Sequence, residues 1–181
     1  MKNKATRQNV LMIGPVPPPT TGQSVMFSLL VDELRKSRSI DTANLSEPPG
    51  RRVQQFSFGR VIQVIKLAFS VIGGLSRTSA VYLTIAQSRV GFLRDIVFIL
   101  ISVLWRRPII AHLHGGNYAQ FYESENAVMR FLIRMTLRRV NRLIVLSDHL
   151  HKDFSFMGEE FTSRLRTVWN TSNLAPGRKR S

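Results

Sequence analysis

The fold of this chain is decided by residues 10–24, which read VLMIGPVPPPTTGQS. The apolar run at 10–13 predicts a buried strand, and the apolar residues of 24–37 recur at helical spacing, which predicts a helix. The loop between them is rich in proline, which fixes φ and removes backbone donors, so the loop is stiff. Gly22 lets the backbone approach a ligand closely, and the helix start offers free N–H groups. This order predicts a ligand-binding loop beside the first strand of an open α/β domain.

The bulk composition predicts one globular domain with a strong positive charge. The chain has 181 residues, of which 44% are hydrophobic, and 26 Lys and Arg against 11 Asp and Glu give a net charge of +15. This excess predicts attraction to a polyanion, either a nucleic acid or an anionic membrane surface. Cysteine is absent, which excludes disulfides and thiolate chemistry and fits a reducing compartment.

No stretch of the sequence has the pattern of a secretion signal or a membrane span. Residues 1–8 are polar and basic, and the apolar run that follows them is short. The longest apolar run, 96–105, is broken only by Ser102 and is too short to cross a bilayer. It predicts a buried helix. The protein is therefore expected to be cytoplasmic, either free or peripheral on the inner face of the membrane.

Strand and helix patterns alternate along the whole chain. Strands are predicted at 10–13, 40–45, 80–85, 108–113, 143–146 and 164–169, and helices at 24–37, 58–75, 90–105, 125–139 and 148–157. This alternation predicts an α/β fold with a Rossmann-like parallel sheet and helices on both faces. Residues 46–52 are expected to form a loop. One domain is expected over 1–172, followed by a disordered basic tail at 173–181.

The helix predicted at 125–139 carries two contrasting faces. The residues expected to form its apolar stripe are Val128, Phe131, Leu132 and Met135. Arg130, Arg134 and Arg138 follow another face, which can be an ordinary solvated surface or a binding surface for phosphates. Nucleic-acid-binding surfaces normally interleave aromatic side chains with polar ones that face the bases. This helix shows no such arrangement. We therefore expect no nucleic acid partner, and an anionic membrane surface as the alternative to simple solvation.

A second informative stretch, AHLHGGN, occupies residues 111–117 at the carboxyl end of a predicted strand. Open α/β sheets bind ligands at that end. His112 and His114 point to the same face of the strand. We interpret His112 as a hydrogen-bonded core residue and His114, which adjoins the turn at Gly115 and Gly116, as a ligand-facing one. A metal site is not expected, because no carboxylate or cysteine lies near the pair in the sequence.

Ser147 and Asp148 directly follow the strand predicted at 143–146. Both could line the same cleft, because they lie at the carboxyl end of a strand, or they could cap the helix that follows. The chain has no nucleophile elbow, P-loop lysine, CxxC or HExxH motif. The glycines of the first loop lack the GxGxxG spacing, so nicotinamide or flavin binding is not expected.

Five segments together resemble a known family. They read IGPVPPPTTGQS at 13–24, GFLRD at 91–95, PIIAHLHGGN at 108–117, RLIVLS at 142–147 and RTVWN at 166–170. In this order and spacing they resemble the N-terminal half of a GT-B glycosyltransferase of the retaining family 4 type, over residues 9–172. The last segment departs from the Pro-Asn-Gly sequence that usually follows this strand in the family.

The resemblance implies a two-domain enzyme, in which the N-terminal half binds the acceptor and the C-terminal half binds a nucleotide sugar. It implies a substrate-binding loop at Thr21, Gly22, Gln23 and Ser24, where Thr21 replaces a glycine of the family. His114 matches a histidine near the transferred sugar, with a role in hydrogen bonding rather than as a base. The remaining positions that match the substrate-binding side of the cleft are Gly115, Gly116, Asn117 and Ser147.

The resemblance also implies a missing part. A family 4 enzyme has a donor-binding domain of similar length, which no residues here match, so transfer is expected to require a separate donor-binding domain or subunit. The co-substrate would be a nucleotide sugar without a metal or other cofactor. The acceptor would be a glycan or lipid-linked sugar of polysaccharide or surface-glycan synthesis. The alternative is a non-catalytic basic module that binds a membrane or a partner. The apolar helices at 58–75 and 90–105 fit either simple cover of the sheet or peripheral membrane contact.

Overall fold

The computed structural model of the protein describes residues 9–46 and 58–169, so most of the predicted loop at 46–52 and the whole predicted tail at 173–181 lie outside the described residues. The strands are β1 (Asn9–Gly14), β2 (Ser39–Asn44), β3 (Ala80–Ile85), β4 (Ile109–Leu113), β5 (Arg142–Val145) and β6 (Leu165–Thr167). The helices are α1 (Gly22–Arg35), α2 (Phe58–Leu75), α3 (Arg89–Leu104), α4 (Tyr118–Ser124), α5 (Ala127–Leu137), the 3₁₀ helix η1 (Asp148–Met157) and α6 (Glu159–Thr162).

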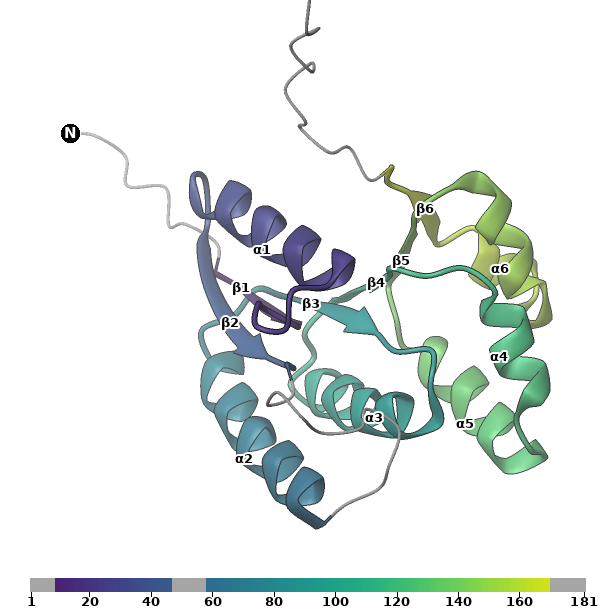
Figure 1. Ribbon diagram of the computed structural model, residues 1–181, viewed down its shortest axis with the longest axis horizontal. Coiled ribbons are helices and arrows are strands. Elements are labelled where there is room, and N and C mark those ends of the chain that lie inside the picture. Colours follow the sequence, from purple (N-terminus) through teal and green to yellow (C-terminus); the bar gives the residue numbers. More distant parts are fainter. Residues whose placement is uncertain (1–8, 47–57, 170–181) are drawn as a thin grey trace, which may run out of the picture.

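All six strands form one parallel sheet in the order β2-β1-β3-β4-β5-β6 (Figure 1). In β1, Met12 lies opposite Thr42 of β2 on one side and opposite Tyr82 of β3 on the other. From β1 the chain first continues to β2 on one side and then crosses to β3 and the later strands on the other side. The connections that follow β1 and β3 therefore lead away from each other at the carboxyl ends of these two strands. Open parallel sheets bind ligands at such a switch point. The predicted α/β fold with a Rossmann-like parallel sheet is confirmed, and its switch point adjoins the proline-rich loop.

Helices cover both faces of the sheet, as predicted (Figure 1). α1 packs on one face, where Met12, Phe27, Val31 and Tyr82 form a small buried cluster. α2, α3 and α5 lie side by side on the other face, over the larger core. Gly14 is required by the first of these layers, because a Cβ at that position would come within 2.3 Å of the Phe27 ring. The end of β1 and α1 are therefore in close contact, which fixes both ends of the loop between them.

The helix predicted at 125–139 corresponds to α5, which is two residues shorter at each end, and a separate helix, α4, lies directly before it. α4 ends at Ser124, and α5 begins after Asn126, whose side chain accepts a hydrogen bond from the Met129 amide at 2.9 Å. The buried residues of α5 are Met129, Ile133, Thr136 and Leu137. Val128 and Phe131 are instead 69% and 63% exposed, so the predicted apolar stripe is wrong at these positions. Both sets of residues recur at helical spacing, and periodicity alone cannot choose between them.

Two further predictions concern helices. Residues 148–157 do form a helix, but it is the 3₁₀ helix η1 rather than an α-helix. The long apolar run lies in α3, where Phe98 and Ile99 are fully buried but Leu100 and Leu104 are 45% and 75% exposed, so the prediction of a buried helix is confirmed for one side of α3 only. Across the described residues, no helix combines the length and the apolar character needed to span a bilayer.

Candidate functional site

The proline-rich loop is tied to the first turn of α1 by hydrogen bonds. Thr21 is the N-cap residue, and its Oγ1 accepts a bond from the Ser24 amide at 3.1 Å. The Ser24 hydroxyl accepts one from the Thr21 amide at 2.9 Å and donates one to the Pro19 carbonyl at 2.9 Å. Such a capping box satisfies donors that a helix start leaves open. Thr21 and Ser24 therefore hold the loop in place, while a Cβ on Gly22 would meet only open space.

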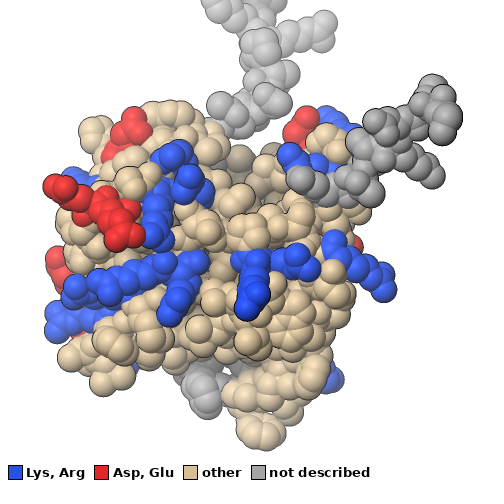
Figure 2. Space-filling model, turned by 180° about the vertical axis from the view of Figure 1, so that it is seen from behind, with Lys and Arg blue, Asp and Glu red and all other residues tan. Residues whose placement is uncertain are grey.

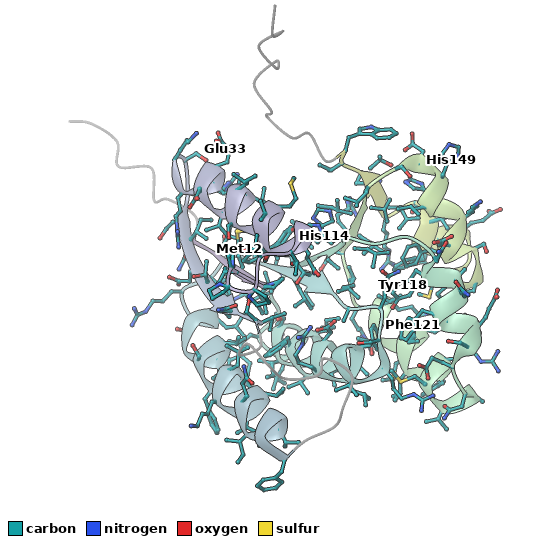
Figure 3. All side chains as sticks on the ribbon, viewed as in Figure 1. Met12, Glu33, His114, Tyr118, Phe121 and His149 are labelled. Carbon is teal, nitrogen blue, oxygen red and sulfur yellow. The ribbon has the colours of Figure 1, made fainter. Side chains whose placement is uncertain are left out.

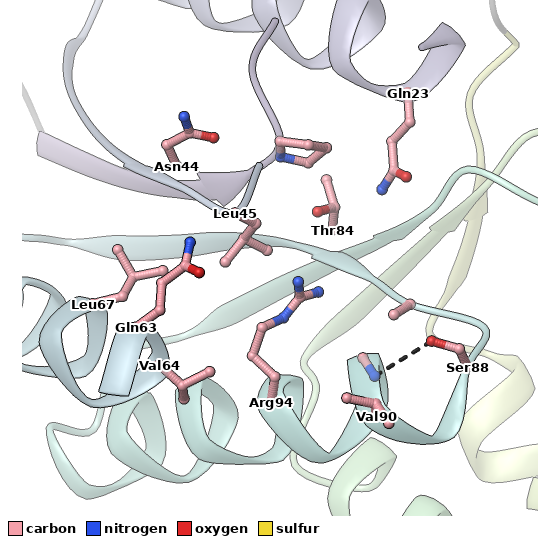
Figure 4. A pocket seen from close by; sticks show the side chains of 13 residues that line it. Gln23, Asn44, Leu45, Gln63, Val64, Leu67, Thr84, Ser88, Val90 and Arg94 are labelled. Atoms are coloured by element: carbon pink, nitrogen blue, oxygen red, sulfur yellow. Dashed lines mark hydrogen bonds between the residues drawn. The ribbon is translucent and has the colours of Figure 1, made fainter. Parts of the chain in front are cut away.

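A cavity of about 220 Å³ lies at the switch point of the sheet, between the ends of β1, β2 and β3 and the helices α1, α2 and α3 (Figure 4). Its polar lining residues are Gln23, Asn44, Gln63, Thr84, Ser88 and Arg94. Leu45, Val64 and Leu67 supply an apolar wall. None of the described residues that line the cavity is acidic. A few polar groups in a partly apolar hollow are typical of small-molecule sites.

Arg94 is the charged group of this cavity, and Asp95 positions it. Asp95 is completely buried; its Oδ1 accepts bonds from Arg94 Nε at 3.0 Å and Nη2 at 2.9 Å. Its Oδ2 accepts a bond from the Ala86 amide at 2.7 Å. Burial raises the pKa of Asp95, although the charge of Arg94 and the Ala86 amide act in the opposite direction. The carboxylate thus links the end of β3 to the first half of α3 and orients the guanidinium, which faces the cavity (Figure 4).

His112 and His114 lie against each other, with ring centroids 3.9 Å apart. His114 directly follows the last residue of β4 (Figure 3). His112 Nδ1 forms a hydrogen bond with the Tyr82 hydroxyl, so His112 is a hydrogen-bonded core residue, as interpreted from the sequence. His112 Nε2 and both ring nitrogens of His114 are buried without a hydrogen-bond partner among the described residues. Burial lowers the pKa of His112 to about 3 and that of His114 to about 4. Both rings are therefore neutral near pH 7, and each neutral imidazole has one donor and one acceptor nitrogen.

The turn that follows His114 packs against Gln87. Gln87, in the loop after β3, donates a hydrogen bond from Nε2 to the Gly116 carbonyl at 2.6 Å. A Cβ on Gly115 would lie 1.9 Å from Gln87 Oε1, so the glycine is needed for this contact. Asn117 has a φ of 62°, in the left-handed region that asparagine tolerates better than most residues. The structure thus gives Gly115 a packing role.

Ser147 occupies the N-cap position of η1, but its side chain makes no capping hydrogen bond. The capping alternative for Ser147 is therefore not what the structure shows, and its half-buried hydroxyl lies at the carboxyl end of β5. Asp148 accepts a hydrogen bond from the Thr167 hydroxyl of β6, and His151 is bonded to the same hydroxyl at 3.0 Å. Asp148 thus connects η1 to the last strand.

The substrate-binding residues predicted from the sequence lie at the carboxyl ends of the strands but do not form one pocket. Of the first loop, Gln23 lines the cavity at the switch point, whereas the residues from His114 to Asn117 and Ser147 follow β4 and β5 and are not among its lining residues. Their roles in substrate binding stay predictions. The sequence reasoning did not assign a site role to Asn44, Gln63 or Arg94. Asn44 could have been found as the last residue of the second strand, but nothing in the sequence brings Gln63 to the same place.

Arg130, Arg134 and Arg138 are exposed along α5, on a surface distinct from the cavity. They line a shallow groove together with Arg139, Tyr122, Phe131 and Met135. Within residues 9–46 and 58–169, no group of three histidine, aspartate or glutamate side chains is placed to hold a metal ion.

Comparisons with known proteins support the fold and leave the family open. No family model and no curated protein matches the chain. Among solved structures, it is similar to UDP-N-acetylglucosamine 2-epimerase from Rickettsia bellii, with a TM-score of 0.58 and 11% sequence identity. The match covers 88% of this chain and 44% of that one, so the chain spans less than half the length of the protein it resembles. At this identity the likeness shows the fold alone, a Rossmann-like α/β fold consistent with one half of a GT-B-like protein.

Proposed function

We propose that this chain is the acceptor-binding half of a glycosyltransferase and that the cavity at the switch point holds the acceptor. The observation that carries this proposal is the chemistry of the cavity lining. Gln23 and Gln63 present side-chain amides, which both donate to and accept from sugar hydroxyls. The apolar wall suits the C–H face of a sugar ring, and Arg94 suits an anionic group on the acceptor, such as a phosphate or carboxylate.

His114 is proposed to assist the reaction by hydrogen bonding. Its nitrogens are buried and have no partner among the described residues, and its pKa of about 4 keeps the ring neutral near neutral pH. A neutral imidazole can donate one hydrogen bond and accept another, which suits a sugar hydroxyl. It binds a proton too weakly for a general base at that pH, because an efficient base has a pKa close to the working pH.

Transfer itself is proposed to require a donor-binding half that supplies a nucleotide sugar, without a metal. The solved structure that the chain resembles is an epimerase named for the nucleotide sugar UDP-N-acetylglucosamine, and the match covers 44% of it. This likeness in fold supports the division into two halves. Charge that develops during transfer must be stabilised by groups placed around the reacting atoms. The acceptor is proposed to be a glycan or a lipid-linked sugar in polysaccharide or surface-glycan synthesis at the cytoplasmic face of a membrane.

The proposal is tested by calorimetric titration of the chain with a panel of ligands. The panel contains neutral trisaccharides, prenyl-pyrophosphate-linked monosaccharides, UDP-N-acetylglucosamine and GDP-mannose. We expect binding of a saccharide acceptor, at least tenfold weaker in Gln23→Ala/Gln63→Ala because a ligand hydroxyl loses two partners. The control is Gln120→Ala, an exposed glutamine of α4 outside the cavity. Equal affinity in all three proteins would remove the cavity from the proposal, and binding of only the free nucleotide sugars would reverse the assignment of the half.

A second candidate function is a non-catalytic module that binds a membrane or a protein. The observation that favours it is the amount of apolar surface exposed on α2, α3 and α5. This second function would be supported over the first if none of the panel ligands bound in the cavity and the protein bound a membrane or a partner protein through these helices.

A further inference from the structure

Exposed apolar side chains are concentrated on one layer of the molecule. Of the twelve large hydrophobic residues that are exposed in the described part of the chain, nine lie on α2, α3 and α5. We call these nine the outer helix face: Phe58, Ile62, Ile65, Phe69, Leu93, Leu100, Leu104, Val128 and Phe131. Soluble proteins rarely expose apolar residues in one continuous area, and such an area usually marks an interaction site.

The outer helix face is built into the spacing of the helices. On α2, Phe58, Ile62, Ile65 and Phe69 recur at intervals of three or four residues and so lie along one side. The other side of α2 packs into the core through Val71 and Leu75. α3 lies between α2 and α5 and packs against both (Figure 1), so the exposed apolar residues of the three helices belong to one layer.

The same layer has cationic groups and no exposed anionic ones. α2 and α5 contain no aspartate or glutamate, and the only acidic residue of α3 is Asp95, which is fully buried. No acidic side chain is visible in the lower part of Figure 2, where this layer lies, and a band of basic side chains crosses the face above it. No ion pair is found among the described residues for Arg130, Arg134 or Arg138, whereas Arg89 is paired with Glu125.

We propose that the outer helix face docks on an anionic lipid membrane, with its apolar side chains at the acyl boundary and the α5 arginines on lipid phosphates. This occupant is the one whose chemistry matches both features, since a bilayer offers an apolar interior and an anionic surface together. A second copy would bring the cations of one chain against those of the other, which is unfavourable. The three helices would lie along the interface, which agrees with the absence of any spanning helix among the described residues.

The proposal is tested by co-sedimentation of the protein with vesicles of phosphatidylcholine alone and of phosphatidylcholine with phosphatidylglycerol. We expect binding to the anionic vesicles only, weakening as salt is added. Arg130→Gln/Arg134→Gln/Arg138→Gln should bind about a hundredfold more weakly, since each basic side chain at an anionic surface strengthens binding about fivefold. Phe58→Ser/Phe69→Ser should bind more than tenfold more weakly, because two exposed rings no longer enter the bilayer.

Two control variants separate the outer helix face from general charge or hydrophobicity. Arg35→Gln/Arg142→Gln/Arg166→Gln removes the same charge from exposed arginines outside the three helices, and Leu29→Ser removes an exposed leucine of α1. Both should bind anionic vesicles like the original protein. Equal loss in the arginine control would mean that net charge alone causes the binding and would overturn the proposal. Vesicle binding that does not depend on lipid charge would also overturn the proposal. A dimer in solution that Phe58→Ser/Phe69→Ser abolishes, together with no binding to vesicles, would overturn it as well.

Discussion

Lowering the pH from about 7 to about 5 should destabilise this protein through His112 and His114. Burial lowers the pKa of His112 to about 3, with a smaller effect of His114, and burial lowers the pKa of His114 to about 4. In an unfolded chain, histidine has a pKa of about 6.5. Between these values the unfolded state binds protons that the folded state does not. The free energy of unfolding therefore falls as the pH falls below about 6.5, and it continues to fall until the folded-state pKa values are reached.

The size of this effect at pH 5 does not depend on the exact folded-state values, because both lie below 5. Each histidine of the unfolded chain is then about 1.5 pH units below its pKa, which at about 1.4 kcal/mol per unit amounts to about 2 kcal/mol. Two such residues give about 4 kcal/mol. His114 is only half-buried, so solvent screening reduces its share, and we expect about 3 kcal/mol for the pair.

Urea unfolding followed by circular dichroism at the two pH values measures this difference. The variant is His112→Gln/His114→Gln, since glutamine keeps a donor and an acceptor but does not titrate. His149→Gln, at an exposed position of η1, is the matched control and should lose stability on acidification as the original protein does. The double variant should lose about 3 kcal/mol less than the control. If it loses as much as the control, the two rings are not held neutral in the folded state and the reasoning is refuted.

Two further substitutions test the packing that positions the site. Asp95→Ala should lower the free energy of unfolding by about 3–5 kcal/mol, because it leaves Arg94 without its buried partner. The control Asp32→Ala, at an exposed ion pair, should change it by less than about 0.5 kcal/mol. Similar losses for the two variants in urea unfolding would contradict a buried ion pair. Ile133→Ala should lower the free energy of unfolding by about 2–5 kcal/mol, and Phe131→Ala should change it by less than about 0.5 kcal/mol, since only the Ile133 side chain is in the core. A larger loss for Phe131→Ala would mean that the face of α5 predicted from the sequence is the buried one.

The parts of the fold that follow from the sequence are those with local signals. Residues 10–24 contain an apolar run, a proline-rich loop and a helix cap, and each of these acts within a few residues of the chain. The alternation of strand and helix patterns was likewise enough to predict a parallel sheet with helices on both faces. The face of α5 was not predictable in this way, because apolar residues occur on two sides of it and only its tertiary contacts, with α3 and α4 among them, select one.

The cavity depends on contacts between residues far apart in the sequence. Gln23, Gln63 and Arg94 come from three helices, and only the strand order brings those helices to one switch point. Gly115 is a predicted substrate-binding residue, but the space beside it is occupied by Gln87, which comes from the loop after β3. No local signal in the sequence places that loop there. Side-chain neighbours of this kind require the tertiary structure.

The cavity and the outer helix face share the same two helices, which has a consequence for the acceptor. Gln63 of the cavity directly follows Ile62 of the outer helix face, and Arg94 directly follows Leu93. A helix with its side chains is about 10 Å across, so a membrane that contacts one side of α2 and α3 lies about that far from a ligand on the other. The headgroup of a lipid-linked sugar could span this distance while its chain stays in the bilayer. If both proposals hold, docking therefore favours a lipid-linked acceptor over a soluble glycan, because only the first gains from a nearby membrane. The two remain separable, since vesicle binding needs no acceptor and the Gln23→Ala/Gln63→Ala variant leaves the outer helix face unchanged.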